Sequence, residues 1–262
     1  MSTVGTIDSL WRYPVKSMKG EPLDEVFVSF AGLMGDRLYS IVKDGGNPGF
    51  PWHTARDQES LLLYKPRYKE AAITVKPGNL EAAQKMAPGI NPLYPDTEQF
   101  SVEVETPDGE TYSLDDAFLE HLKTVANDST LKLHFTQRCQ FDCRPLALFS
   151  TQLEDLLTEA LGTTIDKRRF RANFYVTWHE DKPPLYENDL VGRRLKVGET
   201  LEITVLERDP RCKMVTLDPD TSEANPEIIK HIAQVHEGFA GVYGAVLCEG
   251  VVKAGDTLQL LD

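Results

Sequence analysis

Cys212 has the sequence surroundings that point most directly to chemistry, because it lies between Arg211 and Lys213. Neighbouring positive charge favours the thiolate, which is the nucleophilic and metal-binding form of cysteine. Asp209 and Pro210 predict that the strand before them has ended, so we expect Cys212 on a loop rather than in the core. The alternative interpretation is a partly buried structural cysteine with basic neighbours.

The other three cysteines carry weaker predictions. Cys139 and Cys143 have three residues between them, whereas zinc knuckles and redox dithiols usually have two. His134 lies nearby, but no second cysteine pair completes a tetrahedral set, so no zinc site is expected there. Cys248 lies in an apolar segment and is interpreted as a small core residue. The sequence has no HExxH, GxSxG, Walker or GxGxxG motif.

Basic residues recur beside turns and at the ends of predicted strands. Any one of them is most simply a solvated surface charge, yet the chain as a whole has a formal net charge of −13. Arginine holds phosphate or carboxylate with two hydrogen bonds through its planar fork. The pattern therefore predicts a site for an anionic ligand. Its candidate residues are Lys16 with Ser17, Arg37, Arg56, Arg144, and the cluster of Arg168, Arg169 and Arg171 before Asn173.

Composition excludes several classes of protein. With 28 basic and 41 acidic side chains among 262 residues, the surface repels phosphate backbones, so no nucleic-acid partner is expected. No apolar run reaches the roughly 18–20 residues that cross a bilayer, and the first ten residues lack the pattern of a secretory signal. The four cysteines do not indicate a disulfide framework. We therefore expect a cytoplasmic protein without a membrane span, and by default a monomer.

Short β-type segments must position these residues. They are rich in Val, Ile, Thr and aromatic side chains, and a Pro-Asp-Gly turn at 107–109 predicts a hairpin between 101–106 and 110–113. The predicted strands are Thr3–Tyr13, Arg37–Lys43, Ala72–Lys76, Phe100–Thr106, Leu131–Phe135, Asn173–Trp178, Leu201–Leu206, Gly241–Cys248 and Thr257–Leu261. The fold class is mainly β with a few helices, a β-barrel-rich α+β protein.

Three helices are predicted by caps and apolar periodicity. Asp115 or Asp116 begins one that runs to about Ala126, Ser150 caps a second, and Pro226 lies in the first turn of a third. The proline-rich stretch 76–98 predicts an irregular surface excursion. Residues 127–129 are a plausible junction, which divides the chain into domains 1–128 and 129–262.

The same residues carry a family resemblance that spans nearly the whole chain. Residues 11–20 and 32–37, with the run Tyr-Pro-Val-Lys-Ser, resemble the opening of the MOSC N-terminal β-barrel domain. Residues 169–173 and 211–221, with Arg-Cys followed by Thr and Asp-Pro-Asp-Thr, resemble the core of the molybdenum-cofactor-binding MOSC domain. Two positions depart from the pattern: Ala172, where relatives commonly have proline, and Ser222, where glycine is usual.

The resemblance is to the amidoxime-reducing members of the family and implies a molybdenum cofactor (molybdopterin with Mo) in a cleft between the two domains. It implies that Cys212 ligates molybdenum and is the catalytic residue. The cofactor contacts that it implies are Lys16, Ser17, Arg37, Arg56, Arg144, Arg171, Asn173, Arg211 and Thr216. The physical chemistry agrees, because the cofactor is an anion and its metal takes a thiolate well.

The implied function is a reductase that cleaves the N–O bond of small N-hydroxylated substrates to give amines or amidines, independently of pyridoxal phosphate. Electrons are expected from a separate flavin, haem or iron–sulfur protein. One alternative is a non-catalytic carrier that holds the cofactor, or sulfur, on Cys212. The other is a metal-free β-barrel that binds a small molecule.

Overall fold

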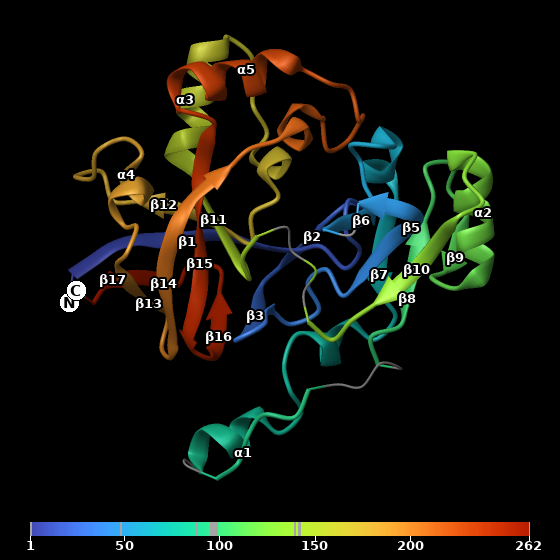
Figure 1. The fold of residues 1–262 in the computed structure, drawn as a ribbon. Coiled ribbons are helices and arrows are strands. Elements are labelled where there is room, and N and C mark those ends of the chain that lie inside the picture. The colour runs from blue at the N-terminus through green and yellow to red at the C-terminus, as the bar shows by residue number, and fades with distance from the viewer. Residues whose placement is uncertain are drawn as a thin grey trace.

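The chain folds into a closed barrel joined to a set of smaller sheets (Figure 1). The structure is a computed structural model, and it describes residues 2–47, 49–86, 89–94, 99–138, 140 and 143–261. Strands dominate and five α-helices lie within this described part, so the predicted class, mainly β with a few helices, is confirmed.

Seven strands close the barrel in the order β12-β11-β15-β14-β13-β17-β1, because β1 also pairs with β12. Their bounds are β1 Ser2–Arg12, β11 Leu146–Ser150, β12 Phe174–Trp178, β13 Arg194–Val197, β14 Leu201–Pro210, β15 Phe239–Cys248 and β17 Thr257–Leu260. A short strand, β2 (Glu21–Leu23), adds to the far end of β1. The first and last strands are partners, so the two ends of the chain lie side by side (Figure 1).

Three small sheets make up the rest of the molecule, in the orders β10-β5-β6, β7-β8-β9 and β16-β3-β4. Their bounds are β3 Glu25–Ser29, β4 Gly32–Leu33, β5 Tyr39–Asn47, β6 Phe50–His53, β7 Lys65–Tyr68, β8 Val102–Glu105, β9 Thr111–Ser113, β10 Leu131–Phe135 and β16 Gly250–Lys253. The β8–β9 pair confirms the predicted hairpin, and Gly109 supplies the positive φ of +86° that its turn requires.

The three predicted helices form as their caps indicate. They are α2 (Asp116–Ala126), α3 (Thr151–Leu161) and α5 (Pro226–Val235). Asp115 accepts from the Ala117 amide and Ser150 from the Leu153 amide, so both side chains satisfy helix-end donors. Helices α3 and α5 cover one side of the barrel (Figure 1) and bury Leu153, Leu157, Ile228 and Ile232 in a second core. Two short helices complete the set, α1 (Leu80–Lys85) and α4 (Tyr186–Asp189).

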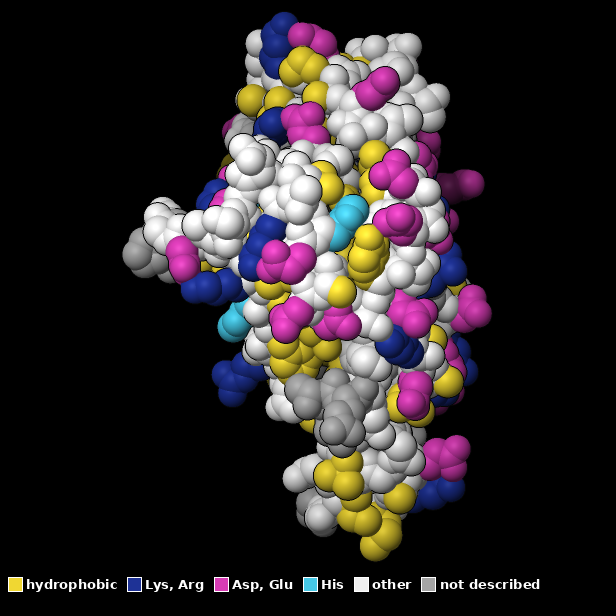
Figure 2. Space-filling view, turned by 90° about the vertical axis from the view of Figure 1, so that its right-hand side faces the viewer, with side chains coloured by type: hydrophobic (Ala, Val, Ile, Leu, Met, Phe, Trp, Pro, Cys, Tyr) yellow, Lys and Arg dark blue, Asp and Glu magenta, His cyan; other side chains and the backbone are white. Residues whose placement is uncertain are grey.

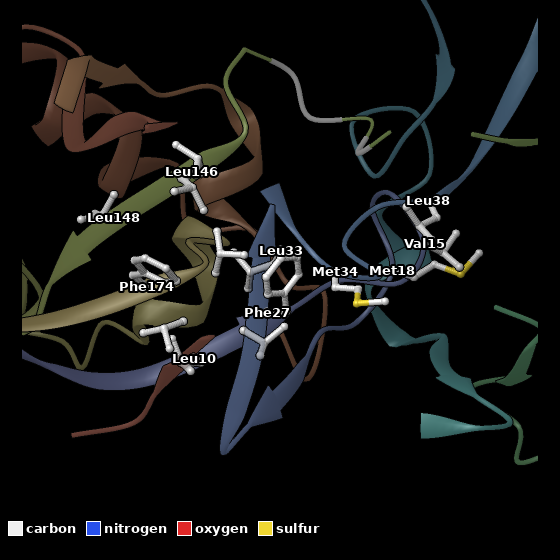
Figure 3. Close-up of a cluster of buried hydrophobic side chains, with 14 of the residues drawn as sticks. Leu10, Val15, Met18, Phe27, Leu33, Met34, Leu38, Leu146, Leu148 and Phe174 are labelled. Carbon is white, nitrogen blue, oxygen red and sulfur yellow. The ribbon is translucent and has the colours of Figure 1, made fainter. Parts of the chain in front are cut away.

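The main core is continuous across the junction predicted at 127–129. Leu10 of β1, Phe27 of β3, Leu148 of β11 and Phe174 of β12 belong to one buried cluster (Figure 3). Strand β1 pairs with β12 and β17, and β3 pairs with β16, so each half of the chain contributes strands to the sheets of the other. The division at 128/129 stays a prediction.

Three local predictions were wrong. Residues 72–76 are no strand: Ala71–Thr74 is a 3₁₀ helix, in which the Thr74 hydroxyl donates to the Ala71 carbonyl and the buried Arg12 side chain donates to the Thr74 carbonyl. The strand from Leu201 does not end at Leu206, because β-bulges carry β14 past Asp209 to Pro210. Cys248 is exposed rather than in the core.

The predicted excursion at 76–98 projects from the body with the short helix α1 at its tip (Figure 1), and residues 87, 88 and 95–98 lie outside the described part. Its exposed side chains include Met86 and Leu93 at 60% and 69%. Figure 2 shows hydrophobic side chains gathered at the lower tip, and acidic and basic side chains scattered over the face above it. No described helix combines the length and apolar character that crossing a membrane requires.

Candidate functional site

The largest cluster of predicted site residues lines one pocket, with a volume of about 240 Å³. Residues from both halves of the chain contribute, from Lys16 to Tyr243. The predicted residues in its lining are Lys16, Ser17, Arg37, Arg56, Arg144, Arg171, Asn173, Arg211 and Cys212. Arg169 of the predicted arginine cluster also lines the pocket, whereas Arg168 and Thr216 do not. The Thr216 hydroxyl donates to the Lys213 carbonyl over 2.8 Å, which supports the turn that follows Cys212.

Cys212 lies between the end of β14 and a 3₁₀ turn over Lys213–Thr216. The thiol is free and partly buried, as a residue on a loop at a pocket wall should be. Its flanking cations are engaged elsewhere: Arg211 lies 2.7 Å from Asp209 and Lys213 lies 2.6 Å from Glu59. Both neighbouring cations are therefore paired with carboxylates, although Arg211 still lines the same pocket as the thiol. The cations that share its pocket come mainly from other segments.

Arg211 acts as a brace between three parts of the pocket wall. Its Nε donates to the Ala240 carbonyl over 2.7 Å and its Nη1 to the Phe170 carbonyl over 3.0 Å, while Nη2 faces the buried carboxylate of Asp209. With these contacts, the guanidinium holds the Cys212 segment against the turn before β12. Asn173 also holds backbone segments together. Its side-chain oxygen accepts from the Ala147 amide, and its side-chain nitrogen donates to the Trp11 carbonyl.

Arg37 and Arg171 both stack on the buried ring of Tyr13. Their guanidinium carbons lie 4.6 Å and 4.2 Å from the ring centre. Such cation–π contacts stabilise by about 0.5–2 kcal/mol each. Asp36 completes the arrangement, because its carboxylate pairs with Arg37 and accepts from the Tyr13 amide over 2.8 Å.

Three of the pocket residues have left-handed backbones, although none is glycine. Ser17, Arg37 and Arg171 have φ values of 67°, 47° and 51°. Non-glycine residues in this region are strained by about 1–3 kcal/mol and concentrate at functional sites. With these backbone conformations, the side chains of Arg37 and Arg171 reach the same pocket from two different turns.

The pocket is strongly cationic in an acidic protein. Its lining includes one carboxylate, Asp209, and seven cations: Lys16, Arg37, Arg56, Arg144, Arg169, Arg171 and Arg211. Burial lowers the pKa of Arg171 to about 10, and its Nη2 has no hydrogen-bond partner among the described residues. With seven cations against one carboxylate, the charge of this lining favours an anionic ligand.

The rim and the interior of the pocket differ in exposure. Lys16 is only 6% exposed, donates to the Gln140 carbonyl over 2.9 Å and lies 4.7 Å from the Trp52 ring centre. Arg56 and Arg144 are exposed, and Arg144 pairs with Glu207 over 3.0 Å. Anionic groups bound deep in the pocket would therefore meet Lys16, whereas the rim arginines meet a ligand as it enters.

Several residues of the site were not predicted. Phe50, Cys143 and Tyr243 line the pocket, and Tyr13 packs beneath two of its arginines. Tyr13 lies three positions before Lys16 in a quoted motif, so its place was available to sequence reasoning. The others come from separate loops, and nothing in their spacing indicates a common pocket. Within the described ranges, no group of three or more His, Cys, Asp or Glu side chains is arranged to hold a metal ion.

Comparison with known proteins agrees with the resemblance in the sequence. Residues 4–126 match the family model described as MOSC N-terminal beta barrel domain, and residues 130–259 match the MOSC domain. Mitochondrial amidoxime reducing component 2 of Macaca fascicularis is 26% identical over 247 residues, covering 84% of this chain and 69% of the relative. The protein of the same name from Homo sapiens is also 26% identical, with the same coverage.

Among solved structures, the YUAD protein from Bacillus subtilis covers 97% of this chain and 94% of its own, at 12% identity and a TM-score of 0.49. This similarity is too low to support an inference about function. The two family models together extend over nearly the whole chain, and the residues that line the pocket lie in both. The chain therefore belongs to the MOSC-domain family, with a MOSC N-terminal beta barrel domain ahead of its MOSC domain.

Proposed function

We propose that this protein binds the pterin-based molybdenum cofactor in the pocket at Cys212 and reduces small N-hydroxylated substrates. The observation that carries the proposal is the combination, in one pocket, of a free thiol with seven cations in a chain of net charge −13. Such a pocket suits an anion that also carries a thiolate-binding metal. The names of the amidoxime reducing relatives support the choice of substrate class.

The pocket residues divide into three roles under this proposal. Cys212 ligates the metal, and Lys16, Ser17, Arg37 and Arg171 bind the phosphate and the pterin from the buried side. Arg56 and Arg144 attract the anion at the exposed rim. Arg211, Asn173 and Thr216 hold the backbone that presents these groups, as their own hydrogen bonds indicate.

The bound cofactor would supply the two-electron chemistry that removes oxygen from nitrogen. The N–O bond breaks, two electrons and two protons are taken up, and the products are an amine or amidine and one water. Arg56 and Cys143 line the pocket and are exposed, so solvent can supply the protons. The electrons come from a separate flavin, haem or iron–sulfur protein, and the acidic surface favours a donor with a basic face.

The proposal is tested by turnover of an amidoxime with a reduced viologen dye as electron source, using protein from a host that makes the cofactor. Wild type should release the amidine, and Cys212→Ser should lose turnover while keeping its fold. Cys248→Ser is the matched control, because that thiol is exposed and does not line the pocket. Tight cofactor binding without reduction of any N-hydroxylated compound would contradict the proposed reductase activity. It would favour the alternative, in which the protein is a carrier of the cofactor.

A further inference from the structure

A second, smaller cavity lies on the other side of the cationic wall. Its volume is about 20 Å³, and it shares Arg169, Arg171 and Met214 with the lining of the large pocket. The remaining residues around it are Trp11, Tyr13, Lys19, Gly20, Leu62, Arg168, Leu217 and Pro219. A cavity of this size holds one water molecule or one monatomic ion, since about 10–15 Å³ is enough for a water.

Three residues in the lining of this cavity each carry a buried N–H donor that has no acceptor among the residues that the structure describes. The donors are Trp11 Nε1, Arg169 Nε and Arg171 Nη2. The other two nitrogens of Arg169 are satisfied, by the Thr216 carbonyl at 2.9 Å and by Asp218 at 2.7 Å. Roughly 90% or more of buried polar groups in native structures have a partner. Three unsatisfied donors around one small cavity therefore indicate a ligand that accepts hydrogen bonds.

The charges around the cavity favour an anion over a water molecule. A water must also donate two hydrogen bonds, but the polar side chains in the lining are donors: Lys19, Arg168 and the Tyr13 hydroxyl, which donates to the Ala172 carbonyl over 3.3 Å. No carboxylate belongs to the lining as described.

The nearest acids lie outside that lining. Asp220 pairs with Lys19 and Arg168, Asp166 with Arg168, and Asp218 with Arg169. Arg171 forms no ion pair within the described ranges, and the acid whose charge acts on it is Asp36, which itself pairs with Arg37.

We propose that this cavity is a halide-binding site, in which a chloride-sized anion accepts from Trp11 Nε1, Arg169 Nε and Arg171 Nη2. The apolar side chains of Leu62, Met214 and Leu217 complete the lining of the cavity. The bound anion offsets the burial of both guanidinium groups, for which the pKa is lowered in the structure. It thereby holds Arg171 at the boundary of the larger pocket without entering that pocket.

The site is tested with the purified protein in chloride, bromide or gluconate at equal ionic strength. Chloride and bromide should raise the unfolding temperature with a saturable dependence, and gluconate, which is too large for the cavity, should not. Trp11→Phe removes one donor and should raise the halide midpoint about tenfold, from the loss of one hydrogen bond to a charged group. Trp52→Phe is the matched control, since Trp52 bonds Gln140 and does not line the cavity.

Anomalous diffraction from crystals soaked in bromide locates the bound halide directly. An anomalous peak within hydrogen-bond distance of the three nitrogens is expected. Absence of that peak, or a halide midpoint that is the same in Trp11→Phe and wild type, would overturn the proposal and leave a water in the cavity. Neither measurement involves molybdenum or turnover, so the halide site and the proposed function stand or fall separately.

Discussion

Arg37 donates from Nη2 to the carbonyl oxygen of Arg171 over 2.8 Å, across 134 positions of sequence. Both residues have left-handed backbones, and both guanidinium groups stack on Tyr13. The bond joins the turn before β5 to the turn before β12, and these two turns bring the N-terminal and C-terminal cations into one pocket. The cationic site is therefore a product of the tertiary structure.

Arg37→Ala should weaken both the fold and ligand binding. The Asp36 carboxylate is fully buried and would lose its cation. Removing one partner of a buried ion pair costs about 3–5 kcal/mol. Urea unfolding measures the loss, and molybdenum content measures ligand retention. Lys132→Ala is the control, because its pair with Asp44 is exposed and should change stability little. Equal free energies of unfolding for the two variants would contradict the role of Arg37 as the counter-ion of buried Asp36.

Tyr13 should act through its ring rather than its hydroxyl. Tyr13→Phe keeps the surface on which Arg37 and Arg171 stack and loses only long hydrogen bonds of 3.3 and 3.4 Å. Tyr13→Leu loses the ring, and two cation–π contacts of about 0.5–2 kcal/mol each predict at least a several-fold weaker hold on the cofactor. Cofactor release during dialysis compares the variants. If Phe and Leu behave alike, the ring is not what orients the arginines.

The periodic parts of this fold could be predicted from the sequence, and the irregular parts could not. Ser150 and Pro226 begin helices as expected, because local hydrogen bonds and apolar periodicity determine those ends. Thr74 was assigned to a strand by its β-type neighbours, but buried Arg12 holds its carbonyl in a 3₁₀ turn. That contact joins residues 62 positions apart, so no local pattern reveals it.

The candidate site shows the same division. Cys212 and most of the cations could be named, because they lie in motifs or beside turns, and the structure brings them into one pocket. The charge around the thiol was attributed to Arg211 and Lys213, whose side chains in fact pair with Asp209 and Glu59. Ser222 stands where the family resemblance implies glycine, and its φ of 60° lies in the left-handed region that glycine favours.

Glu187 should make the free energy of unfolding decrease as the pH rises above the usual pKa of a glutamate. This carboxyl is 1% exposed, and burial raises its pKa from 4.5 although Ser150 and Trp178 donate to it. A raised folded-state pKa means that the folded protein binds the proton more tightly. Its stabilising contribution is full below the unfolded pKa and is lost as pH increases through the folded pKa.

Glu187→Gln should remove that slope in urea unfolding measured from pH 4.5 upward. Glu159→Gln, an exposed position on α3, is the control and should leave the slope unchanged. A wild-type slope that survives in Glu187→Gln would show that another group carries the pH dependence.

The thiols should differ in their rates of alkylation by iodoacetamide. Cys143 and Cys248 are exposed and should react first, whereas the partly buried Cys212 should react more slowly. Peptide mapping by mass spectrometry measures each rate. Loading the cofactor should protect Cys212 and leave Cys248 unaffected, because only Cys212 of these two lines the pocket. Undiminished labelling of Cys212 in loaded protein would mean that the thiol is not covered by the ligand.

The ligation of molybdenum by Cys212 is tested most directly by metal analysis of protein from a host that makes the cofactor. Wild type, Cys212→Ala and Cys143→Ala should be compared, because both thiols line the pocket but only Cys212 follows β14 directly after Arg211, which holds that segment in place. Near-stoichiometric molybdenum in wild type and Cys143→Ala, with a large loss in folded Cys212→Ala, is the predicted result. Equal molybdenum in all three proteins, or none in any of them, would contradict Cys212 as the metal ligand.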